Sequence, residues 1–464
     1  MIPKNIRKIV GASLALGAVL CLVDCGGSRS SRQTAQPMSG GSPATRTSST
    51  AQARFTGFDE VIANHTVRMM KEGRDTFRHD TFGSEAFWGD TLGLHEAIEG
   101  SESKHLGGVS PKTALSVGLK VDADALPGEL LVRIKSGLVN MDDPATTVAL
   151  LKARAVVGVA GFFEEKGRLK SVGITCALCH STVDDSFSAG IGRRLDGWAN
   201  RDLNVGKIVS LAPNLDPIAA MLQTDVDKVK KVLESWGPGK YDAELDKDGK
   251  AVRPDGKSGA TLLPPAFGLA GVNLHTYTGF GSVPYWNAYV ATTQMHGKGV
   301  YRDERLKDAG RFPVAARTGS WNTRGDDDRV TPKLAALHFY QLSIPAPQPP
   351  AGSFEPAAFA RGQILFEGKA TCSTCHVPPL YTEPGSNLHA PAEIGIDDFQ
   401  AERSPTKAYR TTPLRGLWSH QRGGFYHDGR FPTLAEVLEH YDRHLKLNLT
   451  DAEKKDLIQF LLGL

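Results

Sequence analysis

The sequence predicts a mainly α-helical fold made of two helical domains, and three observations support this prediction. The same Cys-x-x-Cys-His pentapeptide occurs twice, at residues 176–180 and 372–376. Apolar residues recur at helical spacing in long segments, whereas the alternation typical of strands is scarce. A proline-rich segment at residues 345–352 separates the two motifs and is typical of a stiff linker. We therefore expect domains at residues 55–344 and 353–464, the first of them enlarged by insertions.

The N-terminal residues 1–25 are typical of an export signal. Three basic residues precede an apolar run, residues 9–23, which is too short for a confident membrane span. Cys25 is followed by Gly-Gly-Ser and by a polar stretch, residues 26–54, a pattern similar to the lipidated cysteine and flexible tether of bacterial lipoproteins. We therefore expect a periplasmic protein that reaches a membrane only through this N-terminal anchor.

Helical periodicity marks three segments of the first domain. The mature part begins with apolar residues at helical spacing over residues 58–70. A second helical pattern covers residues 145–163, and a third covers residues 225–236, with two aspartates suited to its first turn. Residues 246–259 are polar and contain glycines, which predicts a loop within an insertion.

The second domain shows three helical segments around its pentapeptide. Residues 357–368 form an amphipathic pattern that leads directly into the motif. Residues 434–441 and 450–462 continue the pattern towards the C-terminus. Thr450 and Glu453 form a capping box, which marks the start of the last helix. Three helices with little strand signal predict an all-helical domain.

The pentapeptide itself predicts covalently attached c-type haem. Two thiols add across the porphyrin vinyl groups, and the adjacent imidazole binds the iron. A redox disulfide or half of a zinc site would also use Cys-x-x-Cys, but the histidine that follows in both copies argues against them. We therefore predict two haems, attached through Cys176 and Cys179 and through Cys372 and Cys375, with His180 and His376 as proximal iron ligands. The remaining two of the 6 cysteines lie in the N-terminal segment, so no pair is left for a disulfide.

Charge does not identify a binding partner. The chain has 54 basic and 51 acidic side chains, a net charge of +3, so no overall field favours nucleic acid.

The second iron ligand of each haem is less constrained by the sequence. None of the 7 methionines lies beyond Met295, so the second haem lacks a local methionine and should have a lower potential than a His/Met haem. For the first haem, Met295 and His296 lead over Met221 and His275, and an open sixth position is equally tenable.

Residues 410–441 resemble the C-terminal haem domain of the diheme cytochrome c peroxidase-like superfamily, which includes bacterial diheme peroxidases and the diheme maturase of methylamine dehydrogenase. The resemblance rests on Pro-Leu-Arg at residues 413–415, His-Asp-Gly at 427–429 and Thr-Leu-Ala-Glu at 433–436. It is strong over about the last hundred residues and loose before them. Residues 82–100 have no counterpart in those enzymes.

The resemblance implies several further site residues. Tyr441 stands where the peroxidases place a methionine and the maturase a tyrosine, so it is the first choice for the second iron, with His440 and His444 as alternatives. Trp198 resembles the interhaem tryptophan of the peroxidases. Gln223 and Glu234 are spaced like the polar pair above the peroxidatic haem. A Ca²⁺ site between the domains would use Asn200 or Asn204 with backbone oxygens of Thr411 and Pro413.

The sequence thus predicts an exported diheme oxidoreductase in which electrons pass between two haems to peroxide or another substrate. The expected partner is a periplasmic electron donor, such as a small cytochrome or a cupredoxin. One alternative is a non-enzymatic electron carrier with both irons six-coordinate. Another is a diheme oxygenase that resembles the rubber-cleaving enzymes, with O₂ binding at the first haem.

Overall fold

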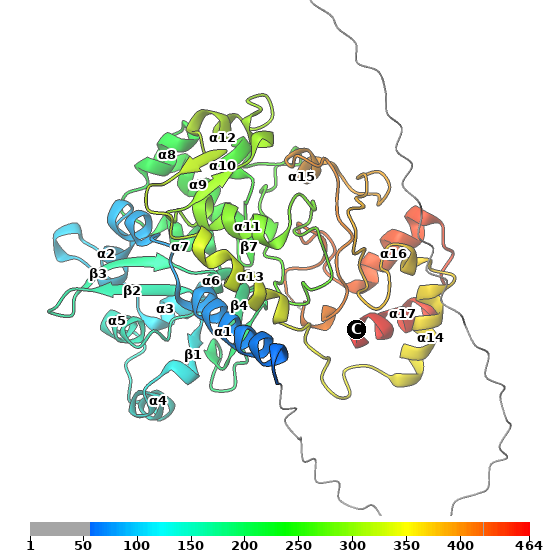
Figure 1. The fold of residues 1–464 in the computed structure, drawn as a ribbon, viewed down its shortest axis with the longest axis horizontal. Coiled ribbons are helices and arrows are strands. Elements are labelled where there is room, and N and C mark those ends of the chain that lie inside the picture. The colour runs from blue at the N-terminus through cyan, green and yellow to red at the C-terminus, as the bar shows by residue number, and fades with distance from the viewer. Residues whose placement is uncertain (1–55, 421) are drawn as a thin grey trace, which may run out of the picture. The chain divides into compact units, whose positions relative to one another are not determined.

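Helices form most of the regular structure in the computed structural model, which describes residues 56–420 and 422–464 (Figure 1). The predicted mainly α-helical class is confirmed. The predictions for the export signal, the lipidated Cys25 and the tether fall outside the described residues. The helices of the first 290 described residues are α1 (Phe58–His79), α2 (Leu94–Glu99), α3 (Pro111–Ser116), α4 (Gly128–Lys135), α5 (Pro144–Lys152), α6 (Ala177–His180), α7 (Val205–Ser210), α8 (Asp216–Leu222), α9 (Val226–Trp236), α10 (Leu245–Asp248), α11 (Val283–Tyr289), α12 (Pro313–Thr318) and α13 (Leu334–Ser343). Those that follow are α14 (Pro356–Glu367), α15 (Phe399–Glu402), α16 (Leu434–Leu445) and α17 (Asp451–Gly463).

Strands are short and pair only two at a time in the described part of the chain. The antiparallel pairs are β2 (Val159–Phe163) with β3 (Leu169–Ile174), β4 (Ser181–Val183) with β6 (Arg194–Asp196), β7 (Lys240–Tyr241) with β8 (Thr261–Leu262), and β9 (Val300–Arg302) with β10 (Asn322–Arg324). The parallel pair is β1 (Val121–Asp122) with β5 (Ile191–Gly192). These two-stranded sheets connect loops to the neighbouring helices and do not form a separate layer of the fold.

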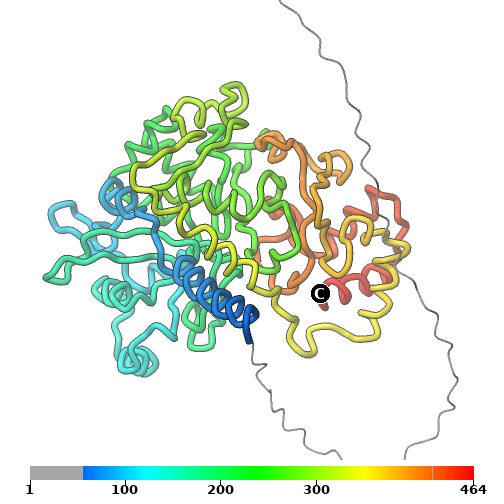
Figure 2. Tube along the Cα trace, in the orientation of Figure 1, coloured from blue at the N-terminus to red at the C-terminus, as the bar shows by residue number. Residues whose placement is uncertain are grey.

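The first helix packs along α13, which lies far from it in the sequence (Figures 1 and 2). Acidic residues in its first turn and Arg78 and His79 in its last turn complement the helix dipole. Gly73 allows the close approach, because a Cβ atom there would lie 2.0 Å from the carbonyl oxygen of Ala336. The predicted helix over residues 58–70 is therefore confirmed and continues to residue 79.

The helix predicted over residues 145–163 is only partly correct. The α5 helix ends at Lys152, and residues 159–163 form strand β2 of a hairpin with β3. Val159, Phe162 and Phe163 are residue types that favour strands. A turn with Gly167 at φ 83° returns the chain to β3, which helical backbone could not do.

The C-terminal helices α14 and α17 pack closely around a shared apolar core. At Gly362 a Cβ atom would lie 2.2 Å from the backbone oxygen of Asp456, so only glycine permits this contact. The predicted capping box at Thr450 and Glu453 is confirmed at the start of α17. A second capping box, formed by Thr433 and Glu436, starts α16.

Residues Phe55–Leu464 form one compact unit. The regions on both sides of the proline-rich segment interact within it, because the backbone N–H of Leu262 donates to His427 O at 2.7 Å. The segment itself is held by Trp418, which donates from Nε1 to Pro347 O at 3.0 Å. The boundary between a domain at 55–344 and a cytochrome c-like domain at 353–464 remains a prediction.

The segment predicted as a polar loop, residues 246–259, is instead largely built into the interior at its start. Lys247 and Asp248 belong to α10 and are 0% and 5% exposed. Asp248 and Asp242 accept hydrogen bonds from Arg403, which lies more than 150 residues further along the chain. The predicted loop is confirmed over residues 249–259, most of which are exposed. It is wrong at α10, because the charge that neutralises these carboxylates is remote in sequence.

A second ion-pair network joins the same two regions. Arg253 contacts Asp397 at 3.0 Å and Asp428 at 2.9 Å, and Arg430 contacts both carboxylates. Burial alone would raise the pKa of Asp428, but its hydrogen bonds and ion pairs with Arg430 and Arg253 lower it to about 2.

Substitution of Asp428 by asparagine is expected to flatten the acid dependence of stability. The unfolded chain takes up this proton near pH 4, whereas the native protein does so only near pH 2, so the stabilisation is present above pH 4 and is lost as pH falls to 2. Between these values the wild type should lose about 2 kcal/mol more of its unfolding free energy than the Asp428→Asn variant. Urea titrations at pH 4.5, 3.5 and 2.5 measure this difference, and parallel curves would contradict it.

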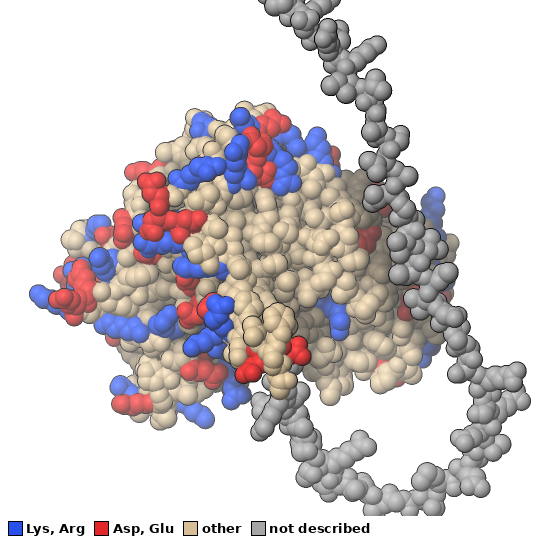
Figure 3. Space-filling model, viewed as in Figure 1, with Lys and Arg blue, Asp and Glu red and all other residues tan. Residues whose placement is uncertain are grey.

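The surface carries charges of both signs in close proximity. On the face shown in Figure 3, acidic and basic side chains alternate around the edge, and a broad area without charged side chains lies between them. None of the helices over residues 56–420 and 422–464 has the length and apolar character needed to cross a membrane.

Candidate functional site

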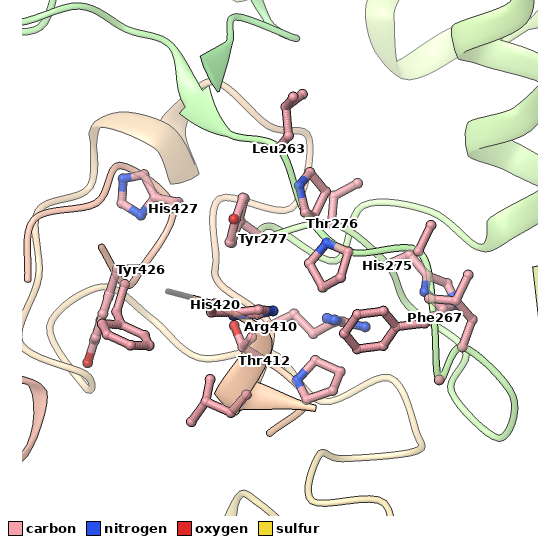
Figure 4. Close-up of a pocket in the computed structure, with 18 of the residues that line it drawn as sticks. Leu263, Phe267, His275, Thr276, Tyr277, Arg410, Thr412, His420, Tyr426 and His427 are labelled. Atoms are coloured by element: carbon pink, nitrogen blue, oxygen red, sulfur yellow. The ribbon is translucent and has the colours of Figure 1, made fainter. Parts of the chain in front are cut away.

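Both pentapeptides face one continuous cavity of about 900 Å³. This volume lies near the upper end of the range for ligand sites in proteins. Cys176, Cys179 and His180 line one part of the cavity, and Cys372, Cys375 and His376 line another. None of the four thiols is in a disulfide. Figure 4 shows the part of this cavity in which residues 263–277 face residues 410–427.

The first motif occupies the short helix α6, between strands β3 and β4. Its His180 donates from Nδ1 to Pro264 O at 3.1 Å, because a carbonyl oxygen can only accept. That bond places the other ring nitrogen, Nε2, in the unprotonated form that binds metals. Burial lowers the pKa of His180, which also favours the neutral ring.

The second motif repeats this arrangement on a single 3₁₀ turn at the end of α14. His376 donates from Nδ1 to Tyr381 O at 3.2 Å, and burial lowers its pKa to about 4. Both histidines therefore fit the role of an iron ligand, held by a backbone carbonyl on the opposite ring nitrogen.

The thiols lack the lowered pKa of an activated redox pair. Burial raises the pKa of Cys176 and Cys179 to about 12 and that of Cys372 to about 11. Catalytic Cys-x-x-Cys pairs instead show a lowered pKa, which makes one thiol reactive. The cysteines, the oriented histidines and the size of the cavity thus fit c-type haem, which supplies one-electron redox chemistry when bound.

Tyr441 lies on the wall of the cavity beside the second motif. It is close enough to Cys372 and Cys375 for their charges to affect its pKa, which is raised mainly by burial. Tyr426 packs against it with ring centroids 6.2 Å apart. The alternatives His440 and His444 do not line the cavity, because their Nε2 atoms interact with Ile394 O at 2.9 Å and Glu393 O at 3.0 Å.

Replacement of Tyr441 by phenylalanine is expected to change the spectrum of one haem and leave haem content unchanged. If the phenol binds the second iron, its loss converts that iron from a six-coordinate to a high-spin form. The EPR spectrum of the oxidised protein should then show the low-spin signal of one haem lost and a high-spin signal gained. The matched control is Tyr409→Phe, a cavity-lining tyrosine whose hydroxyl donates to Asp397 O at 3.1 Å. An unchanged spectrum in Tyr441→Phe would exclude this ligand.

On the side of the first motif, Met295 lines the cavity, whereas His296 does not. Met295 is 5% exposed and follows a π-helical segment, Val290–Gln294, a geometry found often at functional sites. His296 is turned away and stacks on Phe87 with ring centroids 3.5 Å apart. His275 also lines the cavity, and Met221 does not.

Residues 82–100, for which the sequence offered no counterpart, support this side of the cavity. They form a π-helical segment, Ala86–Thr91, followed by α2. Trp88 lines the cavity and donates from its indole nitrogen to Met295 O at 2.9 Å. The segment therefore fixes the position of Met295.

Trp198 lies between the two regions but does not line the cavity. Its ring makes T-shaped contacts with Trp418 at 5.4 Å and with Phe267 at 6.3 Å between centroids. The preceding Gly197 donates its N–H to His180 O at 2.8 Å, so Trp198 is tied to the first motif. This position suits a residue that mediates electron transfer between the two motifs, and that role remains a prediction.

The structure does not bring Gln223 or Glu234 to the cavity. Both are exposed, Gln223 at the end of α8 and Glu234 on the outer face of α9. The spacing of these two residues therefore does not predict their position in the fold. In α9 the buried residues are Val229, Leu233 and Trp236, and Glu234 lies on the exposed side.

The residues predicted for Ca²⁺ are divided. Thr411 and Pro413 line the cavity, but Asn200 donates to Gly118 O at 2.9 Å and Asn204 caps α7, so neither amide lines it. Over residues 56–420 and 422–464 no group of three or more acidic, histidine or cysteine side chains is arranged to hold a metal ion.

Several cavity residues were not predicted from the sequence. Tyr241 lies close enough to Cys179 for their charges to interact, and its pKa is raised by burial. Arg201 follows three residues after Trp198, and Arg410 opens the segment of family resemblance. For Arg410, the one signal in the sequence was its position at the start of the segment that resembles the family. For Tyr241 there was no local signal, because it lies in a part of the first domain that the sequence assigns to an insertion.

Comparisons with known proteins give partial matches. No family model matches the chain. Methylamine utilization protein MauG of Methylorubrum extorquens is 32% identical over 118 residues, which cover 22% of this chain and 33% of that protein. The chain therefore spans about a third of the length of this curated relative. A structure of Kuenenia stuttgartiensis hydrazine synthase, pressurized with 20 bar xenon, shares 19% identity over 48% of this chain and 85% of that chain at a TM-score of 0.27, too low to establish a common fold. Together the geometry and the MauG match relate the chain, weakly and in part, to haem-dependent oxidoreductases.

Proposed function

We propose that this protein is a diheme c-type cytochrome with oxidoreductase activity, in which electrons pass between two haems to peroxide or another substrate. The observation that carries the proposal is the single cavity lined by both Cys-x-x-Cys-His motifs. Two redox groups in one enclosed space can exchange electrons, whereas motifs on opposite surfaces could not.

The protein's own residues supply the orientation of these groups. His180 and His376 are each held on a backbone carbonyl, which fixes the ring nitrogen that faces the cavity. Tyr441 lies beside the second motif, and apolar residues such as Leu178, Val209 and Met295 line the cavity around the first motif. An asymmetric pair, with one iron ligated by tyrosine and the other open, suits an enzyme.

The N-terminal sequence and the cofactor support a site of action outside the cytoplasm. We propose a periplasmic location, with attachment to a membrane only through the N-terminal segment. A small cytochrome or cupredoxin would then deliver the electrons.

The test uses the full chain matured in a host that attaches c-type haem. The purified protein is mixed with hydrogen peroxide and a reduced small cytochrome, and oxidation of the donor is followed optically. Turnover, together with cyanide binding to one iron, is the expected result. Two low-spin irons inert to cyanide and to peroxide in both redox states would overturn the enzymatic proposal.

The second candidate is an electron carrier with both irons six-coordinate, and the position of Met295 favours it. Met295 belongs to the same apolar cluster as Cys176, so its thioether is within the surroundings of the first haem. Exchange of Met295 for alanine would open the first iron to cyanide if this candidate is right. Polymer cleavage under O₂ without added reductant would instead favour an oxygenase.

A further inference from the structure

The wall of the cavity carries positive charge that no protein side chain neutralises. Arg201 and Arg410 line the cavity, together with the exposed Arg415. The one acidic residue among the described lining residues is Glu393, and its Oε1 atom is occupied by His389 at 2.8 Å. A buried cation is costly unless an anion lies beside it.

Two half-buried arginines, Arg201 and Arg410, come from opposite sides of the proline-rich segment and meet at Tyr277. Arg410 belongs to the C-terminal region, yet its guanidinium donates to Leu274 O and its backbone N–H to Tyr277 O. Arg201 belongs to the first region and lies close enough to Tyr277 that its charge, like that of Arg410, acts to lower the pKa of the phenol, which burial raises. Figure 4 shows Arg410 extended between His420 and His275, below Thr276.

The donors of this cluster are left without acceptors. The atoms Nε and Nη1 of Arg201 and Nε of Arg410 are buried and have no hydrogen-bond partner among the described residues. The same holds for Oγ1 of Thr276 and Nε2 of His420. Native proteins satisfy nearly all such groups, so a ligand rich in acceptor oxygens is expected here.

We propose that Arg201 and Arg410 form an anion-binding site at the seam between the two regions, and that its ligands are the propionate carboxylates of the two haems. Each c-type haem is fixed at its vinyl edge by the cysteines, which leaves its two carboxylates to be placed elsewhere in the cavity. Guanidinium groups bind carboxylates through paired hydrogen bonds. The inference rests on the proposed function, because it requires haem at the two motifs.

The experiment measures the midpoint potentials of holoprotein variants by spectroelectrochemistry. A nearby cation favours the reduced haem, so Arg201→Gln and Arg410→Gln should each lower at least one potential. We expect a tenfold or larger shift of that one-electron equilibrium, which corresponds to 59 mV or more. The matched control is Arg422→Gln, which removes a 68% exposed arginine near the same seam and should shift neither potential to that extent.

Three measurements separate the outcomes. Pyridine haemochrome absorbance reports whether haem is attached, and its absence would refute the proposed function and not the site alone. Full haem content with potentials equal to those of the control would overturn the site. A wild-type potential that changes between chloride and phosphate at constant ionic strength would show a free anion and overturn the propionate assignment.

Should a glutamine variant fail to fold, the lysine variants provide the test. Arg201→Lys and Arg410→Lys keep the charge but lose the forked geometry. Their potentials should stay near those of the wild type, while the propionate bending bands in resonance Raman spectra should shift. Unchanged bands in both lysine variants would exclude contact with the propionates.

Discussion

Replacement of Cys372 and Cys375 by alanine is expected to halve the haem bound covalently, from two groups per chain to one. Each porphyrin is anchored by two thioether bonds, and both thiols of this motif are free and line the cavity. Pyridine haemochrome absorbance per chain and the intact mass of the purified protein measure the loss. The second motif would then bind no haem that survives denaturation.

Two further variants make this result specific. Replacement of Cys176 and Cys179 should also halve the covalently bound haem per chain. The remaining spectrum should then be that of the haem at the second motif. The control is Ser373→Ala, which lies between the two cysteines and should retain both haems. A full complement of haem in either double-cysteine variant would refute attachment at that motif, and with it the proposed function.

These haem predictions were accessible from the sequence because the chemistry is local. Attachment needs two thiols and an imidazole within five residues, and the pattern survives without knowledge of the fold. Helices such as α9 and α17 were equally accessible, because Asp225 caps a clearly amphipathic segment and Thr450 forms a capping box with Glu453. The hairpin β2–β3 was not, since β-branched and aromatic residues followed a helix without a strong stop signal.

The buried charges could not be predicted for a different reason. Asp248 was predicted to lie in a polar loop, because its partner Arg403 is far away in the sequence; Arg403 also binds Asp242. The two arginines of the cavity could not be predicted for the same reason. In the sequence Arg201 and Arg410 are typical of surface residues, and only the fold brings both of them to Tyr277. Sequence reasoning thus singled out the two motifs that line the cavity and missed the charged side chains beside them.

Arg403 makes the most deeply buried arginine–carboxylate contacts among the described residues. Its guanidinium donates from Nε to Asp248 Oδ2 at 2.8 Å, from Nη2 to Asp242 Oδ1 at 2.9 Å and from Nη1 to Gly259 O at 3.0 Å. The side chains of Arg403, Asp242 and Asp248 are at most 1% exposed. These contacts join the residue that follows α15 to the segment around α10.

Exchange of Arg403 for methionine is expected to lower the unfolding free energy of the holoprotein by about 3–5 kcal/mol. The loss exceeds that of an ordinary ion pair because two carboxylates remain buried without a cation, and water cannot reach them. The matched control is Arg361→Met, whose pair with Asp456 is 59% exposed on the arginine side and should cost under about 1 kcal/mol. Urea unfolding at neutral pH, followed by circular dichroism, measures both. The addition of Asp242→Asn and Asp248→Asn to Arg403→Met should restore much of the loss, because uncharged amides no longer need the guanidinium. If Arg403→Met and Arg361→Met unfold at the same urea concentration, the buried carboxylates do not depend on Arg403.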